Sequence, residues 1–221
     1  MAQPTIGLIV PPREPLMHPD TRGSRQARFV VEGLGIDEMA AGDFDAAVNR
    51  VGPAAGALGR RGAKAIALLG TSLSFFRGPE SNLGLERMMQ EAAGCPAVTA
   101  STAVVHALRA LGATRLAVGS AYDQAMNARL RDYLAACGFE VKSLVGMNIR
   151  KVREAMAVAD PAILELAQAA SKAAGKADAV LLSCGAFATG HLLQALENRC
   201  SRPVVSTTPA TLAAAVNSIA S

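Results

Sequence analysis

Two short apolar runs, each ending in small residues, constrain the fold most strongly. Residues 179–182 read Ala-Val-Leu-Leu and lead directly into Ser-Cys-Gly at residues 183–185. Residues 65–69 read Ala-Ile-Ala-Leu-Leu and lead into Gly-Thr-Ser at residues 70–72. Continuous apolar runs of this length are typical of strands buried on both faces of a parallel sheet. Ligands bind beyond the carboxyl ends of such strands, so both tips are candidate site segments.

Strand-like and helix-like segments alternate along the whole chain. Strands are expected at residues 5–10, 29–31, 65–69, 96–99, 115–120, 139–145, 179–182 and 203–205. Helices are expected from residue 44, over 79–94, 101–111 and 123–138, from 160, near 191–196 and over 209–220. We expect Asp43 to cap the first of these helices, and Pro53 and Gly56 to kink or shorten it. Alternation of this kind indicates parallel sheets.

The second half of the chain repeats the pattern of the first. From Ile6 to Leu68 is 62 positions, and from Leu116 to Leu181 is 65. The sequence therefore predicts an α/β fold of two pseudo-symmetric, Rossmann-like parallel-sheet domains with a cleft between their strand tips. One domain comprises residues 1–99 plus 206–221, and the other residues 100–205. The alternative is one continuous doubly wound sheet.

Composition excludes several classes of protein. The 221 residues are 51% hydrophobic and carry a net charge of +4, with only two Tyr and six Phe, so a basic nucleic-acid surface with stacking aromatics is not expected. No apolar run is long enough for a membrane span, and no signal peptide is recognisable. The cysteines, which show no C-x-x-C spacing, indicate a reduced, cytoplasmic protein; they are Cys95, Cys137, Cys184 and Cys200.

No sequence pattern indicates a metal or nucleotide cofactor. Residues 70–72 lack the glycine string and lysine of a phosphate-binding loop, and no His, Cys and carboxylate residues have metal-ligand spacing. The histidines are isolated: His106 falls in an apolar helix, and His18 and His191 in polar surroundings. We expect each of them to be structural.

The predicted cleft would collect small, polar and thiol-bearing residues. They are Pro11, Pro12, Gly70, Thr71, Ser72, Tyr122, Cys184 and Gly185. Hydroxyl groups and the free N–H groups of strand-to-helix turns bind anions, which makes this a candidate site for a carboxylate or an enediolate. A helix N-terminus at the second tip would also tune the reactivity of the Cys184 thiol. On spacing alone, Cys184 is equally well interpreted as a small buried hydrophobe.

Several segments resemble the arylmalonate decarboxylase family of the aspartate/glutamate racemase superfamily, which also contains maleate isomerases and hydantoin racemases. They are residues 5–12 (TIGLIVPP), 70–78 (GTSLSFFRG), 101–104 (STAV), 108–112 (LRALG) and 181–185 (LLSCG). The resemblance runs over nearly the whole chain. It implies a cofactor-free site between two pseudo-symmetric domains.

The resemblance also implies residue roles. Racemases of the superfamily carry a cysteine at each tip, whereas this chain has Gly70 at the first and Cys184 at the second. Cys184 would be the single proton donor. The retained carboxylate would bind to the hydroxyls of Thr71, Ser72 and Tyr122 and to the backbone N–H groups around Cys184 and Gly185.

An apolar wall is expected opposite these donors. By the same resemblance its residues are Ile36, Met39, Phe44 and Met156. Arg153 falls where an apolar residue is expected, and a shift of one residue would put Val152 there instead. A buried arginine would favour an additional anionic group on the substrate. The chain also departs from the family at Ala186, where a glycine is expected, and in the loop of residues 13–28, which forms either a disordered flap or part of the site wall.

The predicted function is cofactor-independent decarboxylation of a disubstituted malonate bearing an aryl or alkenyl group. Two alternatives stay open: an isomerase or racemase of a small dicarboxylate or amino-acid derivative, and a non-catalytic carboxylate-binding protein. The partner is a small-molecule carboxylate in each case. The sequence does not distinguish a monomer from a small homo-oligomer.

Overall fold

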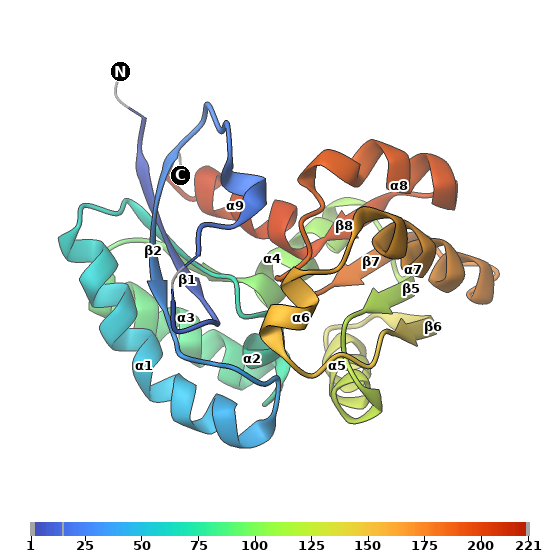
Figure 1. Ribbon diagram of the computed structural model, residues 1–221, viewed down its shortest axis with the longest axis horizontal. Coiled ribbons are helices and arrows are strands. Elements are labelled where there is room, and N and C mark those ends of the chain that lie inside the picture. Colours follow the sequence, from blue (N-terminus) through green and yellow to red (C-terminus); the bar gives the residue numbers. More distant parts are fainter. Residues whose placement is uncertain (1–2, 15, 220–221) are drawn as a thin grey trace.

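The strands form two parallel sheets with the same strand order. The computed structural model describes residues 3–14 and 16–219, and within them each sheet has four strands (Figure 1). The first sheet runs β2 (Arg28–Gly33), β1 (Thr5–Val10), β3 (Ala65–Leu68), β4 (Ala97–Thr99). The second runs β6 (Glu140–Gly146), β5 (Arg115–Ser120), β7 (Ala179–Ser183), β8 (Val204–Ser206). The α/β fold of two similar halves is confirmed, and the continuous sheet is excluded.

Strand pairing makes the two halves equivalent in detail. In each sheet the first strand along the chain lies between the second and the third, and every pair is parallel. Ile9 of β1 lies opposite Leu68 of β3, and Ser120 of β5 lies opposite Ser183 of β7. The carboxyl ends of β3 and β7 therefore occupy equivalent places, each beside the central strand of its own sheet.

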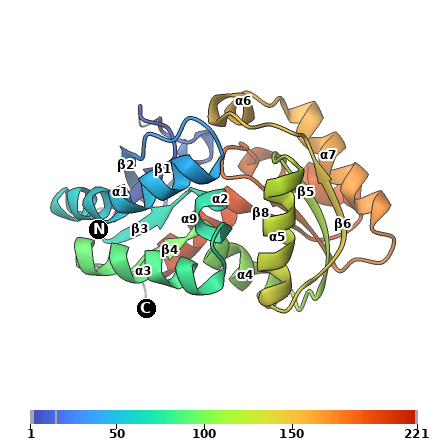
Figure 2. The same ribbon diagram turned by 90° about the horizontal axis from the view of Figure 1, so that it is seen from below.

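Helices cover both sheets and join the halves (Figures 1 and 2). The first sheet packs against α1 (Ala41–Arg60), α3 (Pro79–Ala93) and α9 (Thr207–Asn217), and the second against α5 (Gln124–Ala136), α7 (Asp160–Ala173) and α8 (Leu193–Cys200). The remaining helical elements are η1 (Pro19–Thr21), α2 (Thr71–Phe75), α4 (Ala100–Ala110), α6 (Val152–Met156) and η2 (Gly190–Leu192). The C-terminal α9 lies against β3 and β4, although it follows the last strand of the second sheet. The exact domain boundaries stay a prediction.

Helix α1 differs from its prediction at both ends. It begins at Ala41 with Ala40 as N-cap, so the prediction that Asp43 caps it is wrong; the Asp43 carboxylate instead accepts a hydrogen bond from the Glu38 N–H at 3.0 Å. The helix also continues through Pro53 to Arg60 without stopping.

The glycines of α1 explain why the helix persists. A methyl group at Gly52 would lie 3.3 Å from Met88 Cγ, and one at Gly56 would lie 3.2 Å from the carbonyl oxygen of Ala92. Both neighbours belong to α3, so the glycines let the two helices approach closely. Packing energy gained across this contact outweighs the poor helix propensity of Pro and Gly.

No helix among residues 3–14 and 16–219 is long and apolar enough to cross a bilayer.

Candidate active site

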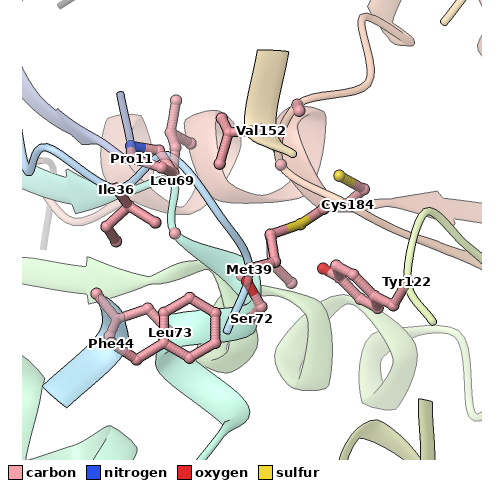
Figure 3. Close-up of a pocket in the computed structure, with 14 residues that line it drawn as sticks. Pro11, Ile36, Met39, Phe44, Leu69, Ser72, Leu73, Tyr122, Val152 and Cys184 are labelled. Carbon is pink, nitrogen blue, oxygen red and sulfur yellow. The ribbon is translucent and has the colours of Figure 1, made fainter. Parts of the chain in front are cut away.

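A cavity lies where the carboxyl ends of the central strands of both sheets converge. Its free space, including the opening to solvent, is about 360 Å³. Figure 3 shows Cys184 and Tyr122 on one side, and Ile36 and Phe44 on the other. The lining residues are Pro11, Ile36, Met39, Phe44, Leu69, Gly70, Thr71, Ser72, Leu73, Tyr122, Val152, Cys184, Gly185 and Ala186.

The two strand tips touch each other at this cavity. A methyl group at Gly185 would overlap the carbonyl oxygen of Leu69 and lie 3.0 Å from Thr71 Oγ1. Position 185 therefore has no room for a side chain. The backbone after β7 and the backbone after β3 thus line one site, although the residues are more than a hundred positions apart in sequence.

Thr71 provides an unpartnered donor at the first tip. Its hydroxyl is buried and forms no hydrogen bond within the part of the chain that the structure describes. The carbonyl of the same residue accepts hydrogen bonds from Ser74 Oγ at 2.8 Å and from Ser101 Oγ at 3.5 Å, which fix the turn. The buried Ser72 lies beside it in the first turn of α2, where N–H groups have no partner within the helix. This tip can donate hydrogen bonds to an anion.

Tyr122 brings a third hydroxyl from the tip of β5. The side chain is buried, and its ring makes an edge contact with Phe75 at a centroid distance of 5.5 Å. Burial and the proximity of Cys184 raise the pKa of the phenol well above its usual value, while the nearby hydroxyls of Ser183 and Thr71 act in the opposite direction. The phenol therefore remains protonated and acts as a donor.

Cys184 is a buried, protonated thiol. Its exposed fraction is 3%, and burial raises the pKa of the thiol to about 11, against the opposing effect of the backbone N–H groups of Ala186 and Phe187. No helix begins directly at this tip, so no helix N-terminus tunes the thiol: a turn follows β7, and the next helical residue is Gly190, near the helix expected at residues 191–196. The thiol therefore has the properties of an acid, not of a thiolate nucleophile.

An apolar wall stands on the other side of the cavity and joins the two halves. Met39 N–H donates to the Arg150 carbonyl at 2.8 Å, and Val152 N–H donates to the Asp37 carbonyl at 3.0 Å. These bonds hold α6 over the segment that carries Ile36 and Met39. No charged side chain lines this cavity among the described residues.

Arg153 does not belong to the cavity. Its side chain is 68% exposed and pairs with Glu14 at 3.1 Å, while Val152 is buried and lines the cavity. Of the two alternatives, Val152 therefore takes the place in the wall, and Arg153 is not a buried arginine that could bind an additional anionic group. Lys151 is the N-cap of α6. The first helical residue, Val152, therefore faces the cavity, and the second, Arg153, faces solvent.

A second cavity of about 350 Å³ adjoins the first. The two share Pro11, Leu69, Val152, Gly185 and Ala186. Residues that line only the second cavity are Val10, Pro12, Leu16, His18 and Met156. Pro12 and Met156, both predicted for the site, thus lie here.

Sequence reasoning missed several lining residues. Leu69 and Leu73 carry no chemical signal beyond hydrophobicity, and only their position beside the first tip could have identified them. His18 was expected in polar surroundings, but it is 6% exposed and lies against the second cavity. The loop of residues 13–28 thus contributes to the site wall.

The remaining polar candidates lie elsewhere. Cys95, Cys137 and Cys200 are free thiols that line neither cavity. His106 is exposed on α4, and His191 pairs with Asp160 at 2.8 Å on the surface. Within residues 3–14 and 16–219, no three His, Cys, Asp or Glu side chains come together as a metal site.

Comparison with known proteins identifies the family. A profile described as arylmalonate decarboxylase matches residues 6–221. An arylmalonate decarboxylase from Bordetella bronchiseptica is 41% identical over 211 residues, which cover 94% of this chain and 87% of the relative. The chain belongs to the arylmalonate decarboxylase family. It is therefore related to carboxy-lyases, as the resemblance in sequence implied.

Solved structures of the same family superpose closely. A doubly substituted arylmalonate decarboxylase, with a glycine changed to cysteine and a cysteine to serine, was solved in a liganded form; it matches with a TM-score of 0.94 at 36% identity, over 98% of this chain and 93% of that one. The unliganded arylmalonate decarboxylase matches with a TM-score of 0.87 at 38% identity, over 98% and 93%. A maleate isomerase from Pseudomonas putida shares the fold, with a TM-score of 0.85 at 18% identity over 99% and 94%.

Proposed function

We propose that the chain catalyses cofactor-independent decarboxylation of a disubstituted malonate that bears an aryl or alkenyl group. The observation that carries the proposal is one cavity that combines a buried, protonated Cys184 thiol, an unpartnered Thr71 hydroxyl and a wall without charges. Its membership of the arylmalonate decarboxylase family supports the reaction class.

The retained carboxylate binds at the two touching tips. The hydroxyls of Thr71, Ser72 and Tyr122 and the backbone N–H groups beside Gly185 donate hydrogen bonds to its oxygens. These bonds strengthen as negative charge builds on the oxygens during formation of the enediolate. Preorganised donors of this kind each contribute roughly 3–4 kcal/mol to transition-state stabilisation.

The departing carboxylate lies against the apolar wall of Ile36, Met39, Phe44 and Val152. The carbon–carbon bond breaks, carbon dioxide leaves, and the bonding electrons remain on the other fragment as an enediolate. A wall that cannot hydrogen-bond the carboxylate favours the neutral product over the anion.

Cys184 then completes the reaction as general acid. The thiol proton moves to the α-carbon, the enediolate becomes a monocarboxylate, and the sulfur becomes a thiolate. Because the pKa of this thiol is about 11, the thiolate takes up a proton from solvent and restores the acid for the next turnover. A single donor on one face gives a product of one handedness.

Two-base racemisation is less well supported by the site. It requires an acid or base on each face of the planar intermediate, and the first tip carries Gly70 in the place where racemases have a cysteine. In the solved, doubly substituted decarboxylase, the altered glycine and cysteine stand as far apart in sequence as Gly70 and Cys184 do here. The equal spacing supports the assignment of Gly70 and Cys184 to the two positions that were altered in that decarboxylase.

Release of carbon dioxide from phenylmalonate is the direct test. We expect turnover by the purified chain without added cofactor, and formation of phenylacetate in equal amount. Activity after treatment with a metal chelator and dialysis should be unchanged. Binding of phenylacetate without turnover of phenylmalonate would instead support the non-catalytic alternative, and conversion of maleate would support the isomerase.

A further inference from the structure

The second cavity is apolar apart from one side chain. Among the described residues that line it, His18 alone carries a polar side-chain group; the others are aliphatic residues, prolines, a methionine and Gly185. Since this cavity shares part of its wall with the first, a malonate held at the strand tips can extend its larger substituent into it.

His18 is held rigidly by the loop on which it lies. Its Nδ1 accepts a hydrogen bond from the Asp20 N–H at 3.2 Å, which makes His18 the N-cap of η1. Its carbonyl accepts from Thr21 Oγ1 at 2.6 Å. The Asp20 carboxylate accepts from the Thr189 N–H at 3.2 Å and so attaches this loop to the second half. The ring orientation is therefore fixed before any ligand binds.

The opposite ring nitrogen has no hydrogen-bond partner of ordinary geometry among the described residues. Because Nδ1 accepts a hydrogen bond, the proton of the neutral ring resides on Nε2. Nε2 is buried and forms no hydrogen bond within the described residues, although the backbone of Ala186 lies nearby. Burial lowers the pKa of His18, against the raising effects of Asp20 and the Ala186 backbone, so the ring is neutral at pH 7. A buried N–H without a partner is costly, and a ligand that supplies an acceptor recovers that cost.

We propose that His18 is a specificity-determining residue whose Nε2–H binds an uncharged acceptor atom on the larger substituent of the substrate. This inference rests on the proposed decarboxylation. The acceptor is a carbonyl or ether oxygen, or an aromatic ring nitrogen. A second anionic group is disfavoured, because no Lys or Arg side chain among the described residues lines the cavity to compensate for its burial. The preferred substrates are therefore heteroaryl, acyl-aryl or alkoxy-aryl malonates.

The test compares pairs of malonates that differ only in the acceptor. Acetylphenylmalonate, as the meta and the para isomer, is compared with the matching isopropylphenylmalonate, which has nearly the same shape and no acceptor. The quantity of interest is the ratio of kcat/KM for the acetyl compound to that for the isopropyl compound. Comparing this ratio between variants removes the electronic effect of the substituent on the intrinsic reaction.

Two matched variants define the outcome. His18→Asn keeps an acceptor for the Asp20 N–H and so preserves the cap of η1, but its side chain is too short to replace Nε2. His106→Asn changes an exposed histidine and is the control. We expect the ratio to fall about tenfold in His18→Asn for at least one isomer, the worth of one buried hydrogen bond, and to be unchanged in His106→Asn. An unchanged ratio in folded His18→Asn for both isomers would overturn the proposal.

A binding experiment separates this proposal from the proposed function. If the chain releases no carbon dioxide from any of these malonates, the proposed reaction is wrong. The preference for the acceptor is then measured without turnover, as the ratio of the calorimetric Kd values of the matching acetyl- and isopropylphenylacetates. In the parent protein labelled with ¹⁵N-histidine, the His18 Nε2–H signal should shift with the acetyl compound and not with the isopropyl compound. Spectra of His106→Asn and His191→Asn assign that signal among the three histidines. If His18→Asn does not fold, this spectrum decides, and an unmoved signal in the presence of bound acetyl compound contradicts the proposal.

Discussion

The tips of β3 and β7 occupy equivalent places in their sheets but carry different chemistry. The first has Gly70, followed at once by α2, and the second has Cys184, followed by a turn. At Gly70 an added methyl group would make ordinary contacts, 3.4 Å from Leu68 Cδ1 and from Leu73 Cβ, whereas at Gly185 it would overlap the Leu69 backbone.

This difference separates the tasks of the two tips. In the proposed mechanism, the β3 tip contributes only donors to the anion, whereas the β7 tip contributes N–H donors and also the thiol that supplies the proton. The space at Gly70 shows that the fold itself does not prohibit a second side chain on that face. The asymmetry of the two tips is therefore a chemical feature of the site, and changes at either tip can test it.

The largest expected effect comes from Cys184→Ser. Serine keeps the size but is a far weaker acid, so turnover of phenylmalonate should fall at least about a hundredfold, the scale of general acid catalysis. Binding of phenylacetate should survive. Cys95→Ser, at a thiol outside both cavities, should leave turnover unchanged. Retention of most activity by Cys184→Ser would show that another group donates the proton.

The next effect concerns the donor at the first tip. Thr71→Val keeps the shape and removes a buried hydroxyl that has no hydrogen-bond partner among the described residues, so Tm should stay equal or rise slightly. The value of kcat should fall about a hundredfold, because the lost donor acts most strongly on the enediolate. A lower Tm with unchanged kcat would indicate that the hydroxyl is structural.

A smaller effect is expected when either of the two tip glycines is replaced by alanine. Gly185→Ala forces the Leu69 backbone to move, and we expect a loss of about 1–3 kcal/mol in the free energy of unfolding together with about tenfold lower kcat/KM. Gly70→Ala, with its ordinary contacts, should cost under about 1 kcal/mol. Urea unfolding of both variants measures the difference. Equal losses would mean that the tips do not touch as described.

The smallest effect is expected from pH. Deprotonation of Cys184 removes the acid, so activity should fall as pH rises through the pKa of this thiol, about 11. The profile of kcat/KM should be flat between about pH 7 and 9, with circular dichroism confirming that the chain stays folded. Cys184 should also react slowly with iodoacetamide at pH 8, because little of the thiol is then ionised. A decline centred between pH 7 and 9 would contradict a buried, protonated thiol.

The strands were predictable because their signal is local. The apolar runs of β1, β3, β5 and β7 end at or within one residue of their expected positions, and the repeat of these runs predicted two equivalent sheets. The converging tips followed from a general property of parallel sheets. Their place in one cleft followed from the internal repeat, but the close contact of Gly185 with the Leu69 backbone depends on a packing of the two halves that no local pattern gives.

The errors arose where contacts distant in sequence decide the structure. Helix α1 continues past Pro53 because α3 packs against its glycines, which no local pattern reveals. Val152 and Arg153 are neighbours in the sequence, and the backbone hydrogen bonds that hold α6 against the first half decide which of the two side chains lines the site. The polar residues next to His18 in the sequence predicted polar surroundings for it, yet the fold buries its side chain beside the second cavity.

The most direct test of the account moves the thiol from one tip to the other. In Gly70→Cys combined with Cys184→Ser, the proton donor stands on the opposite face of the enediolate, at a position with space for a side chain. With methyl(phenyl)malonate as substrate, chiral chromatography of the 2-phenylpropionate product reports the face of protonation. We predict one enantiomer from the parent and the opposite enantiomer, formed more slowly, from the folded double variant. The same enantiomer from both, or a racemic product from the parent, would contradict the claim that Gly70 and Cys184 flank a shared intermediate.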